Sequence, residues 1–388
     1  MRSSSGRWFL AGTFAVLLLG GGGGVANATS TASGAQPKPR RLVLSNDLIQ
    51  AFAQDGNTVA WINSLRDLYR VRARNVSTGK SFVLGDANDY RTRLRPPTLA
   101  VAGTRVFWTT CWYGTRLYID GRTTTLAERN QRPQPKPVLL FELAQDSEDG
   151  ADNYFAGAAG DGSTLVYGWT HVSPSGEPPA VERVVDGGGV VRVQGPFGTQ
   201  FPPVAPPITN LPVPAPMYSN DGRQQLARQV AVSQGRVAAL PPSYSAGRYS
   251  WSFPRPAEDG PVVVSTRGGT VISRVAPAGT VGGIALAWPN LAVLVQRHDG
   301  AKAVEVYDAG NGRRKSATAV PADASDLAIG TGGVVYRVGR SVYTIGAGGP
   351  RLLWRAQVTP IGLSVEGHRV AWAANVGGRG RIVALTLP

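Results

Sequence analysis

The stretch DGNTVAW at residues 55–61 decides the fold, because its pattern returns along the chain. A glycine, two spacer residues, two apolar residues and an aromatic residue are typical of a tight hairpin turn that leads into a half-buried strand. The pattern recurs at residues 103–108, 162–167 and 367–372, and in weaker form at 235–240, 290–295 and 332–336. The sequence therefore predicts seven copies of one β-hairpin.

The residues between these hairpins predict an all-β domain. Short runs of alternating apolar residues are separated by Gly, Pro, Asn and Asp, and helical periodicity is nearly absent. Seven hairpins over residues 40–388 leave about 50 residues for each unit, the size of a four-stranded propeller blade. We predict a seven-bladed β-propeller of four-stranded blades. A six-bladed ring is the alternative, because residues 241–260 of the fourth unit are poorly patterned.

The two ends of this domain are expected to meet. The last unit offers three strands, at residues 361–365, 370–374 and 381–387, whereas residues 41–45 precede the first unit without a neighbour to pair with. We expect residues 41–45 to form the outermost strand of the last blade. Pairing of this kind closes the ring and removes an open sheet edge.

The motifs of these units carry a family resemblance. After residues 55–61 come Leu68-Tyr69 and STGK at 77–80, and the fifth unit contains VYDAGNG at 306–312. These motifs resemble the TolB-like and WD40-like repeats of exported β-propellers, although the Gly-His opening and Trp-Asp ending of strict WD40 repeats do not occur. The resemblance implies a propeller fold and a tendency to bind proteins or glycans. It implies no catalytic residue.

The N-terminal region is predicted to direct export. Residues 1–28 have the features of a signal peptide: Arg2 and Arg7 precede a short apolar run, and an Ala-x-Ala cleavage site ends at Ala28. Residues 29–39 are predicted to be a flexible tether, and residues 40–388 a single propeller domain. The apolar run of about 12 residues is too short to span a bilayer. We expect a secreted or envelope-associated protein, periplasmic in a diderm cell, that does not span the membrane after cleavage.

Charge and cysteine content limit the partners. The formal net charge is +15, of which Arg2 and Arg7 contribute two positive charges. A basic surface attracts anionic envelope polymers, glycans or lipids, although it can also be simply solvated. No block of Lys and Arg indicates nucleic acid as a partner. The single cysteine, Cys111, allows no intramolecular disulfide. We expect a monomer that binds a protein or an anionic envelope glycan.

Expanded loops indicate where binding takes place. Residues 171–179, 195–225 and 241–260 are expected to leave one face of the propeller around the third and fourth units. These segments and a turn of the second unit carry the candidate binding residues Trp112, Tyr113, Phe197, Phe201, Tyr244, Arg248, Tyr249, Trp251 and Phe253. Aromatic side chains interleaved with cations suit protein hot spots or glycan stacking, or alternatively pack the loops onto the domain. Residues 121–136 are expected to form a linker-like loop at the opposite face.

A propeller hydrolase or lyase acting on an extracellular polysaccharide or peptide is the alternative function. His171 is the candidate catalytic residue, because it lies beside the expanded loops. One acidic group could bind calcium or supply a carboxylate pair, or be a solvated loop: Asp146, Glu148, Asp149 and Asp152. The sequence lacks a G-x-S-x-G nucleophile elbow, an H-E-x-x-H zinc motif and EF-hand spacing. We therefore expect no cofactor and no metal, and binding rather than catalysis.

Overall fold

The computed structural model describes residues 38–65, 68–87, 98–113, 117–144, 152–172, 180–185, 190–194, 230–240 and 261–387. They belong to one compact unit, Gln36–Pro388. Across these ranges the chain forms 28 strands and a single 3-10 helix, so the prediction of an all-β fold is confirmed. The described part of the chain contains no helix long and apolar enough to cross a membrane. The predicted signal peptide and most of the tether lie outside the described residues.

The strands form seven four-stranded antiparallel sheets, numbered here in chain order. Sheet 1 contains β2 (Leu48–Asp55), β3 (Thr58–Leu65), β4 (Leu68–Asn75) and β5 (Ser81–Asp86). Sheet 2 contains β6 (Leu99–Ala102), β7 (Arg105–Tyr113), β8 (Leu117–Thr125) and β9 (Val138–Ala144). Sheet 3 contains β10 (Asp152–Asp161), β11 (Thr164–Val172), β12 (Ala180–Val185) and β13 (Val190–Gln194). Sheet 4 contains β14 (Val230–Ser233), β15 (Arg236–Ala239), β16 (Val262–Thr266) and β17 (Val271–Val275).

The remaining three sheets follow the same plan. Sheet 5 contains β18 (Thr280–Ala287), β19 (Asn290–Gln296), β20 (Lys302–Asp308) and β21 (Arg314–Val320). Sheet 6 contains β22 (Ala324–Gly330), β23 (Gly333–Val338), β24 (Ser341–Gly346) and β25 (Gly349–Arg355). Sheet 7 contains β26 (Ile361–Glu366), β27 (Arg369–Val376), β28 (Arg379–Thr386) and β1 (Arg40–Ser45).

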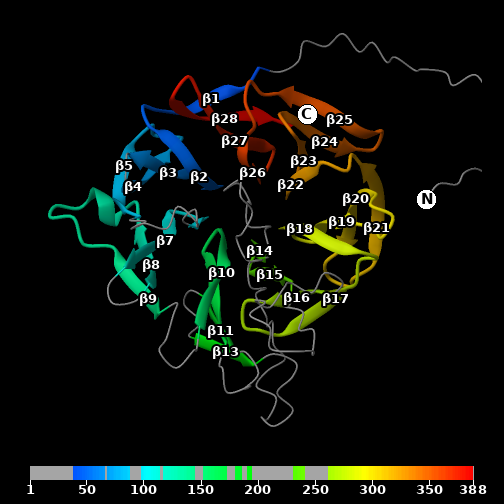
Figure 1. Cartoon of the computed structure of the whole chain (residues 1–388), viewed down its shortest axis with the longest axis horizontal. Helices are drawn as coiled ribbons and strands as arrows, with labels where there is room; N and C mark the ends of the chain where they lie inside the picture. Colours follow the sequence, from blue (N-terminus) through cyan, green and yellow to red (C-terminus); the bar gives the residue numbers. More distant parts are fainter. Residues whose placement is uncertain are drawn as a thin grey trace, which may run out of the picture. The chain divides into compact units, whose positions relative to one another are not determined.

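The first strands of the seven sheets surround a common axis. Each of β2, β6, β10, β14, β18, β22 and β26 contacts the next, and β26 contacts β2. The sheets are arranged around these strands as in a β-propeller (Figure 1). We call the end where the first strand turns into the second the turn face, and the opposite end the link face. In every sheet two residues separate the first strand from the second.

The repeated motif forms these two-residue turns. Gly56, Gly103, Gly162 and Gly367 are the first turn residues of sheets 1, 2, 3 and 7, and their φ angles lie between +52° and +61°. A side chain strains the backbone in this left-handed region, whereas glycine adopts it freely. Glycine is therefore favoured at this position of the turn, as the repeat predicts, and Gln234 adopts the same region in sheet 4 at φ +49°.

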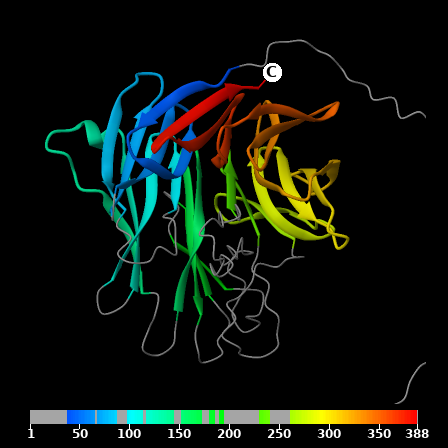
Figure 2. The same ribbon diagram turned by 45° about the horizontal axis from the view of Figure 1, so that its top comes forward.

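The N-terminal strand completes sheet 7, as predicted. Arg40 pairs with Ala384, Val43 with Ile382 and Leu44 with Arg381, so β1 runs along β28 (Figure 2). The side chain of Asn375 on β27 joins sheet 7 to sheet 1, because its amide accepts a hydrogen bond from Ile49 N on β2 at 2.8 Å and donates one to Ile49 O at 2.9 Å. The beginning and the end of the described domain are thus held together.

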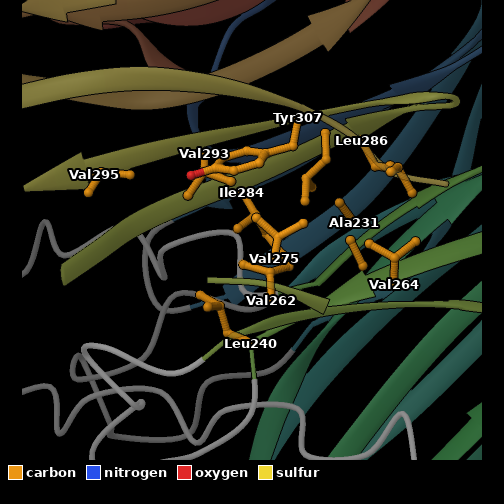
Figure 3. Close-up of a cluster of buried hydrophobic side chains, with 13 residues drawn as sticks. Ala231, Leu240, Val262, Val264, Val275, Ile284, Leu286, Val293, Val295 and Tyr307 are labelled. Atoms are coloured by element: carbon orange, nitrogen blue, oxygen red, sulfur yellow. The ribbon is translucent and has the colours of Figure 1, made fainter. Parts of the chain in front are cut away.

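Apolar side chains between neighbouring sheets form the core. Because side chains alternate between the two faces of a strand, a sheet that packs on both sides buries both sets. Trp108 and Trp372, which follow repeated turns, are almost fully buried. Between sheets 4 and 5, Leu240, Val262 and Ile284 belong to one cluster with Tyr307, as Figure 3 shows. Burial of this kind stabilises by about 25 cal/mol per Å² of apolar surface.

The expectation for residues 121–136 is confirmed in position, because the interval 126–137 joins a third strand to a fourth and so lies opposite the link face. The linker-like character predicted for them is wrong. Strand β8 continues to Thr125, and a 3-10 helix, η1 (Glu128–Asn130), follows it. The Glu128 carboxylate accepts a hydrogen bond from Thr125 N at 2.7 Å, which lowers the pKa of Glu128. Arg129 is buried and donates to Leu84 O at 2.7 Å and Pro135 O at 3.0 Å. These contacts fix the segment against sheet 1.

Candidate functional site

Long connections join strand ends at the link face. The intervals between consecutive strands that exceed five residues are 87–98, 126–137, 145–151, 173–179, 195–229 and 240–261. All except 126–137 connect a second strand to a third or a fourth strand to the next first strand. The strand ends that flank them therefore lie at the link face, in sheets 1 to 4. At the turn face, every connection except 126–137 has five residues or fewer.

Only part of the predicted binding group lies within the described residues. Trp112 and Tyr113 are the last residues of β7 and pair with Tyr118 and Leu117, at the link face. The remaining candidates lie outside the described residues: Phe197, Phe201, Tyr244, Arg248, Tyr249, Trp251 and Phe253.

The predicted catalytic and acidic candidates are similarly divided. His171 lies on β11 opposite Asn153, and Asp152 begins β10 opposite Val172. Both residues lie at the link face of sheet 3, but their adjacent register positions belong to opposite sides of the sheet. Asp146, Glu148 and Asp149 lie outside the described residues. Among the described residues no group of three or more His, Cys, Asp or Glu side chains is placed to hold a metal ion.

Three carboxylates gather at the turn face. Asp55, Asp161 and Glu366 are the last residues of β2, β10 and β26, the first strands of sheets 1, 3 and 7. Each directly precedes the glycine of its turn. Because the first strands surround the axis, residues at this position of the repeat come together. We call these three residues the axial carboxylates.

Asp55 joins three sheets. It is 4% exposed, and its Oδ2 accepts hydrogen bonds from Gly103 N at 2.5 Å and Gly162 N at 2.7 Å. The first donor belongs to the turn of sheet 2 and the second to the turn of sheet 3. The two turns lie close together at the axis, because a Cβ on Gly103 would lie 2.7 Å from Gly162 O. Asp55 thus fixes the spacing of three turns.

The other turns are joined by similar hydrogen bonds. Asp161 Oδ2 accepts from Gln234 N at 2.5 Å, and Ser233 Oγ accepts from Trp288 N at 3.1 Å. Arg369 donates from Nε to Gln54 Oε1 at 3.0 Å and from its guanidinium to Gly56 O. These bonds connect sheet 3 to sheet 4, sheet 4 to sheet 5 and sheet 7 to sheet 1. The turn face is therefore tied together by specific contacts.

Burial and mutual repulsion perturb two axial carboxylates. Burial raises the pKa of Glu366, and the nearby carboxylates of Asp55 and Asp161 raise it further, while the Gly56 N–H and Arg369 oppose the shift. Burial also raises the pKa of Asp161, with a smaller contribution from Asp55, against the hydrogen bond from Gln234 N. A raised carboxylate pKa means that the folded state prefers the protonated form.

This preference predicts a pH-dependent effect of Glu366→Gln. The folded pKa of Glu366 lies above its unfolded value, so stability falls as pH rises from the ordinary glutamate range through the folded pKa. The glutamine retains an acceptor for Gly56 N and removes the charge. We expect Glu366→Gln to raise Tm at pH 7.5 by about 2–4 °C, the shift that about 1 kcal/mol produces. The difference from wild type should diminish towards pH 4.

Calorimetry at pH 7.5 and pH 4 tests this expectation. Glu142→Gln is the matched control, because Glu142 is exposed and lies on β9, the strand of sheet 2 that is farthest from the axis. It should change Tm little at either pH. A lower Tm for Glu366→Gln at pH 7.5 would show that the Glu366 charge stabilises the turn face.

The sequence motif contained a signal for the axial carboxylates. Asp55-Gly56 and Asp161-Gly162 are each typical of a tight turn. The additional signal is positional: an acidic residue stands directly before the turn glycine in three units of the repeat. In a closed ring, equivalent positions of the first strands face a common axis. The repeat pattern and the closure of the ring together therefore predict that Asp55, Asp161 and Glu366 lie near one another.

Comparisons with known proteins support the fold. No protein-family model and no curated protein sequence matches the chain. The β-propeller domain of the Trilobed protease from Pyrococcus furiosus has a TM-score of 0.51 and 9% identity, over 88% of this chain and 98% of that one. Pyrococcus horikoshii acylaminoacyl peptidase has a TM-score of 0.51 and 10% identity, over 84% of this chain and 49% of that one. TolB from Acinetobacter baumannii has a TM-score of 0.38 and 13% identity, over 71% and 55%.

At these identities the likeness concerns the fold alone. The chain spans about half the length of the acylaminoacyl peptidase, so the activity of that protein does not transfer. The β-propeller predicted from the repeats is confirmed by the sheets and by these comparisons.

Proposed function

We propose that this chain is an exported, seven-bladed, non-catalytic β-propeller that binds a protein partner or a cell-envelope glycan at the link face. The observation that carries the proposal is the distribution of the long connections: five of the six intervals above five residues join strand ends at this face, in sheets 1 to 4. Binding residues are found disproportionately on loops that a rigid scaffold positions. Here the scaffold is rigid at its other end, where hydrogen bonds tie the turns together.

The residues of this site are the aromatic and cationic side chains of the long connections. Tyr244, Arg248, Tyr249, Trp251 and Phe253 fall within one interval, 240–261. Trp112 and Tyr113 lie on β7 at the same face. Aromatic rings offer large contact area at low cost in conformational entropy, and Arg adds hydrogen-bond donors, so this composition suits a protein hot spot or a sugar ring.

Capture from envelope extract and on a glycan array tests the proposal. We expect Trp251→Ala and Tyr249→Ala each to reduce capture at least about tenfold, as loss of an aromatic hot spot of about 1.4 kcal/mol or more does. Trp288→Ala is the control, because Trp288 is a partly buried tryptophan of a turn at the opposite face. Circular dichroism establishes that all three variants are folded. Unchanged capture by both link-face variants would remove the aromatic residues from the site.

A hydrolase or lyase is the second candidate, and one observation favours it. His171 lies on β11 at the link face, just before the interval 173–179. A histidine at a face that carries long connections can act as a general acid or base. If the chain is an enzyme, purified protein should cleave an extracellular polysaccharide or peptide, and His171→Ala should abolish the cleavage while leaving capture intact. Absence of turnover by the wild type would eliminate this candidate.

A further inference from the structure

The third strand of sheet 1 carries a row of arginines on one face. Arg70, Arg72 and Arg74 alternate along β4 with Val71 and Ala73, so the arginines share one side of the sheet. Successive arginines are separated by two residues, which corresponds to about 6.6–6.8 Å along a strand. We call these three residues the arginine row.

Cross-strand pairs show which way the arginine row faces. Arg72 lies opposite Trp61 and Arg74 opposite Val59 on β3. Trp61 and Val59 belong to the core between sheets 1 and 7. The arginine row is therefore on the side of sheet 1 that faces sheet 7. Val71 and Ala73 are buried on the other side, in the core shared with sheet 2.

Two further residues extend this surface. Arg40 on β1 is exposed and lies opposite Ala384, a member of the same core between sheets 1 and 7. Val83 on β5 lies opposite Arg72 and is 46% exposed. With an apolar side chain exposed among the cations, the anionic groups of a ligand can contact the arginines while the hydrocarbon part between those groups contacts Val83.

The arginine row has little anionic compensation from the protein. Arg70 pairs with Asp86 at 3.2 Å, and both side chains are substantially exposed. Asp86 is the one carboxylate on β4 and β5. Among the described residues, Arg72 and Arg74 form no ion pair and no side-chain hydrogen bond, whereas Arg314 and Arg337 on other sheets are paired with Glu305 and Asp326. Positive charge on this surface is thus available to a ligand.

We propose that the arginine row, with Arg40, binds an extended phosphodiester polymer that lacks nucleobases, such as a polyol-phosphate chain of the cell envelope. Guanidinium groups bind phosphate in a fixed, often bidentate geometry. A straight strand sets them at regular intervals, which matches a linear polymer with repeating charges better than a single small anion. Among the described residues of this face, Trp61 is buried and no exposed aromatic ring offers a base a stacking surface.

This site is independent of the proposed link-face site. The arginine row lies on the flank of the ring between two sheets, and its residues belong to β4 and β1 rather than to the long connections. Trp251→Ala should therefore leave polymer binding unchanged. Failure of one proposal would not remove the other.

Binding to purified poly(glycerol phosphate), measured by interferometry with the full mature chain, tests the proposal. We expect Arg72→Ala with Arg74→Ala to weaken binding at least tenfold, and Asp86→Ser to strengthen it, because that change removes the carboxylate that pairs with Arg70. Affinity should fall as salt rises. The control is Arg351→Ala with Arg355→Ala, which removes the same charge from two exposed positions of the outer strand β25. It should alter affinity less than threefold.

Several outcomes would overturn the proposal. Equal losses in the two double variants would show attraction by net charge alone. Absence of binding by the wild type at low salt would eliminate the site. Binding of single-stranded DNA more tightly than poly(glycerol phosphate) would mean that bases contribute and that the ligand class is wrong. The gain expected from Asp86→Ser does not depend on a destabilising substitution, so a failure there could not be attributed to misfolding.

Discussion

Trp108→Ala is expected to lower the free energy of unfolding by about 3–5 kcal/mol, the range for large-to-small changes at buried aromatic residues. Trp108 is fully buried in the core between sheets 1 and 2. It lies opposite Leu99 on β6 and Arg122 on β8, and its ring reaches Gly85 on sheet 1, where an added Cβ would lie 3.0 Å from it. Removing the ring therefore leaves a cavity bordered by two sheets that backbone hydrogen bonds hold in place.

Urea unfolding followed by circular dichroism measures this loss, and Trp108→Phe is the informative control. The indole Nε1 of Trp108 is buried and has no hydrogen-bond partner among the described residues. Phenylalanine removes this unpaired donor while retaining most of the ring, so its cost should be less than half that of alanine. If Trp108→Phe proved as destabilising as Trp108→Ala, the indole nitrogen would have a partner that explains the loss.

The local part of the fold could be predicted from the sequence because its signals are local. A two-residue turn with a glycine at positive φ requires only neighbouring residues, and Gly56 and Gly367 mark such turns without reference to the rest of the chain. The pairing of β1 with β28 was also predictable, since one strand precedes the first repeat and the last repeat lacks its fourth strand. By contrast, the conformation of residues 126–137 depends on a hydrogen bond from Arg129 to the backbone oxygen of Leu84, a residue 45 positions away.

The candidate site was less predictable for the same reason. The aromatic group was identified by composition, which indicates a binding surface without setting the positions of its members. The axial carboxylates depend on ring closure: Asp55 accepts a hydrogen bond from Gly162, which is 107 positions away. No local pattern distinguishes an aspartate that only supports its own turn from one that also holds the turns of two other sheets.

Asp55→Ala is expected to lower the free energy of unfolding by about 2–5 kcal/mol. The substitution removes the charged acceptor of two backbone donors, Gly103 N and Gly162 N, and a hydrogen bond to a charged group contributes about 1.5–3 kcal/mol. Loss of the Asp55 charge also relieves its repulsion of Glu366, so the net cost should fall below the sum of the two donors. Denaturant unfolding at pH 7.5 measures the change.

Asp55→Asn separates the hydrogen bonds from the charge. The asparagine oxygen can accept from both amides, so most of the stability should be retained, with a loss of about 1 kcal/mol, the difference between charged and neutral acceptors. Without the Asp55 charge, the pKa of Glu366 should move back towards its ordinary value, because Asp55 is one of the groups that raise it. The stabilising effect of Glu366→Gln at pH 7.5 should therefore be smaller in the Asp55→Asn background. Equal effects in both backgrounds would mean that the two carboxylates do not interact, and that Asp55 acts on the turn face through its hydrogen bonds alone.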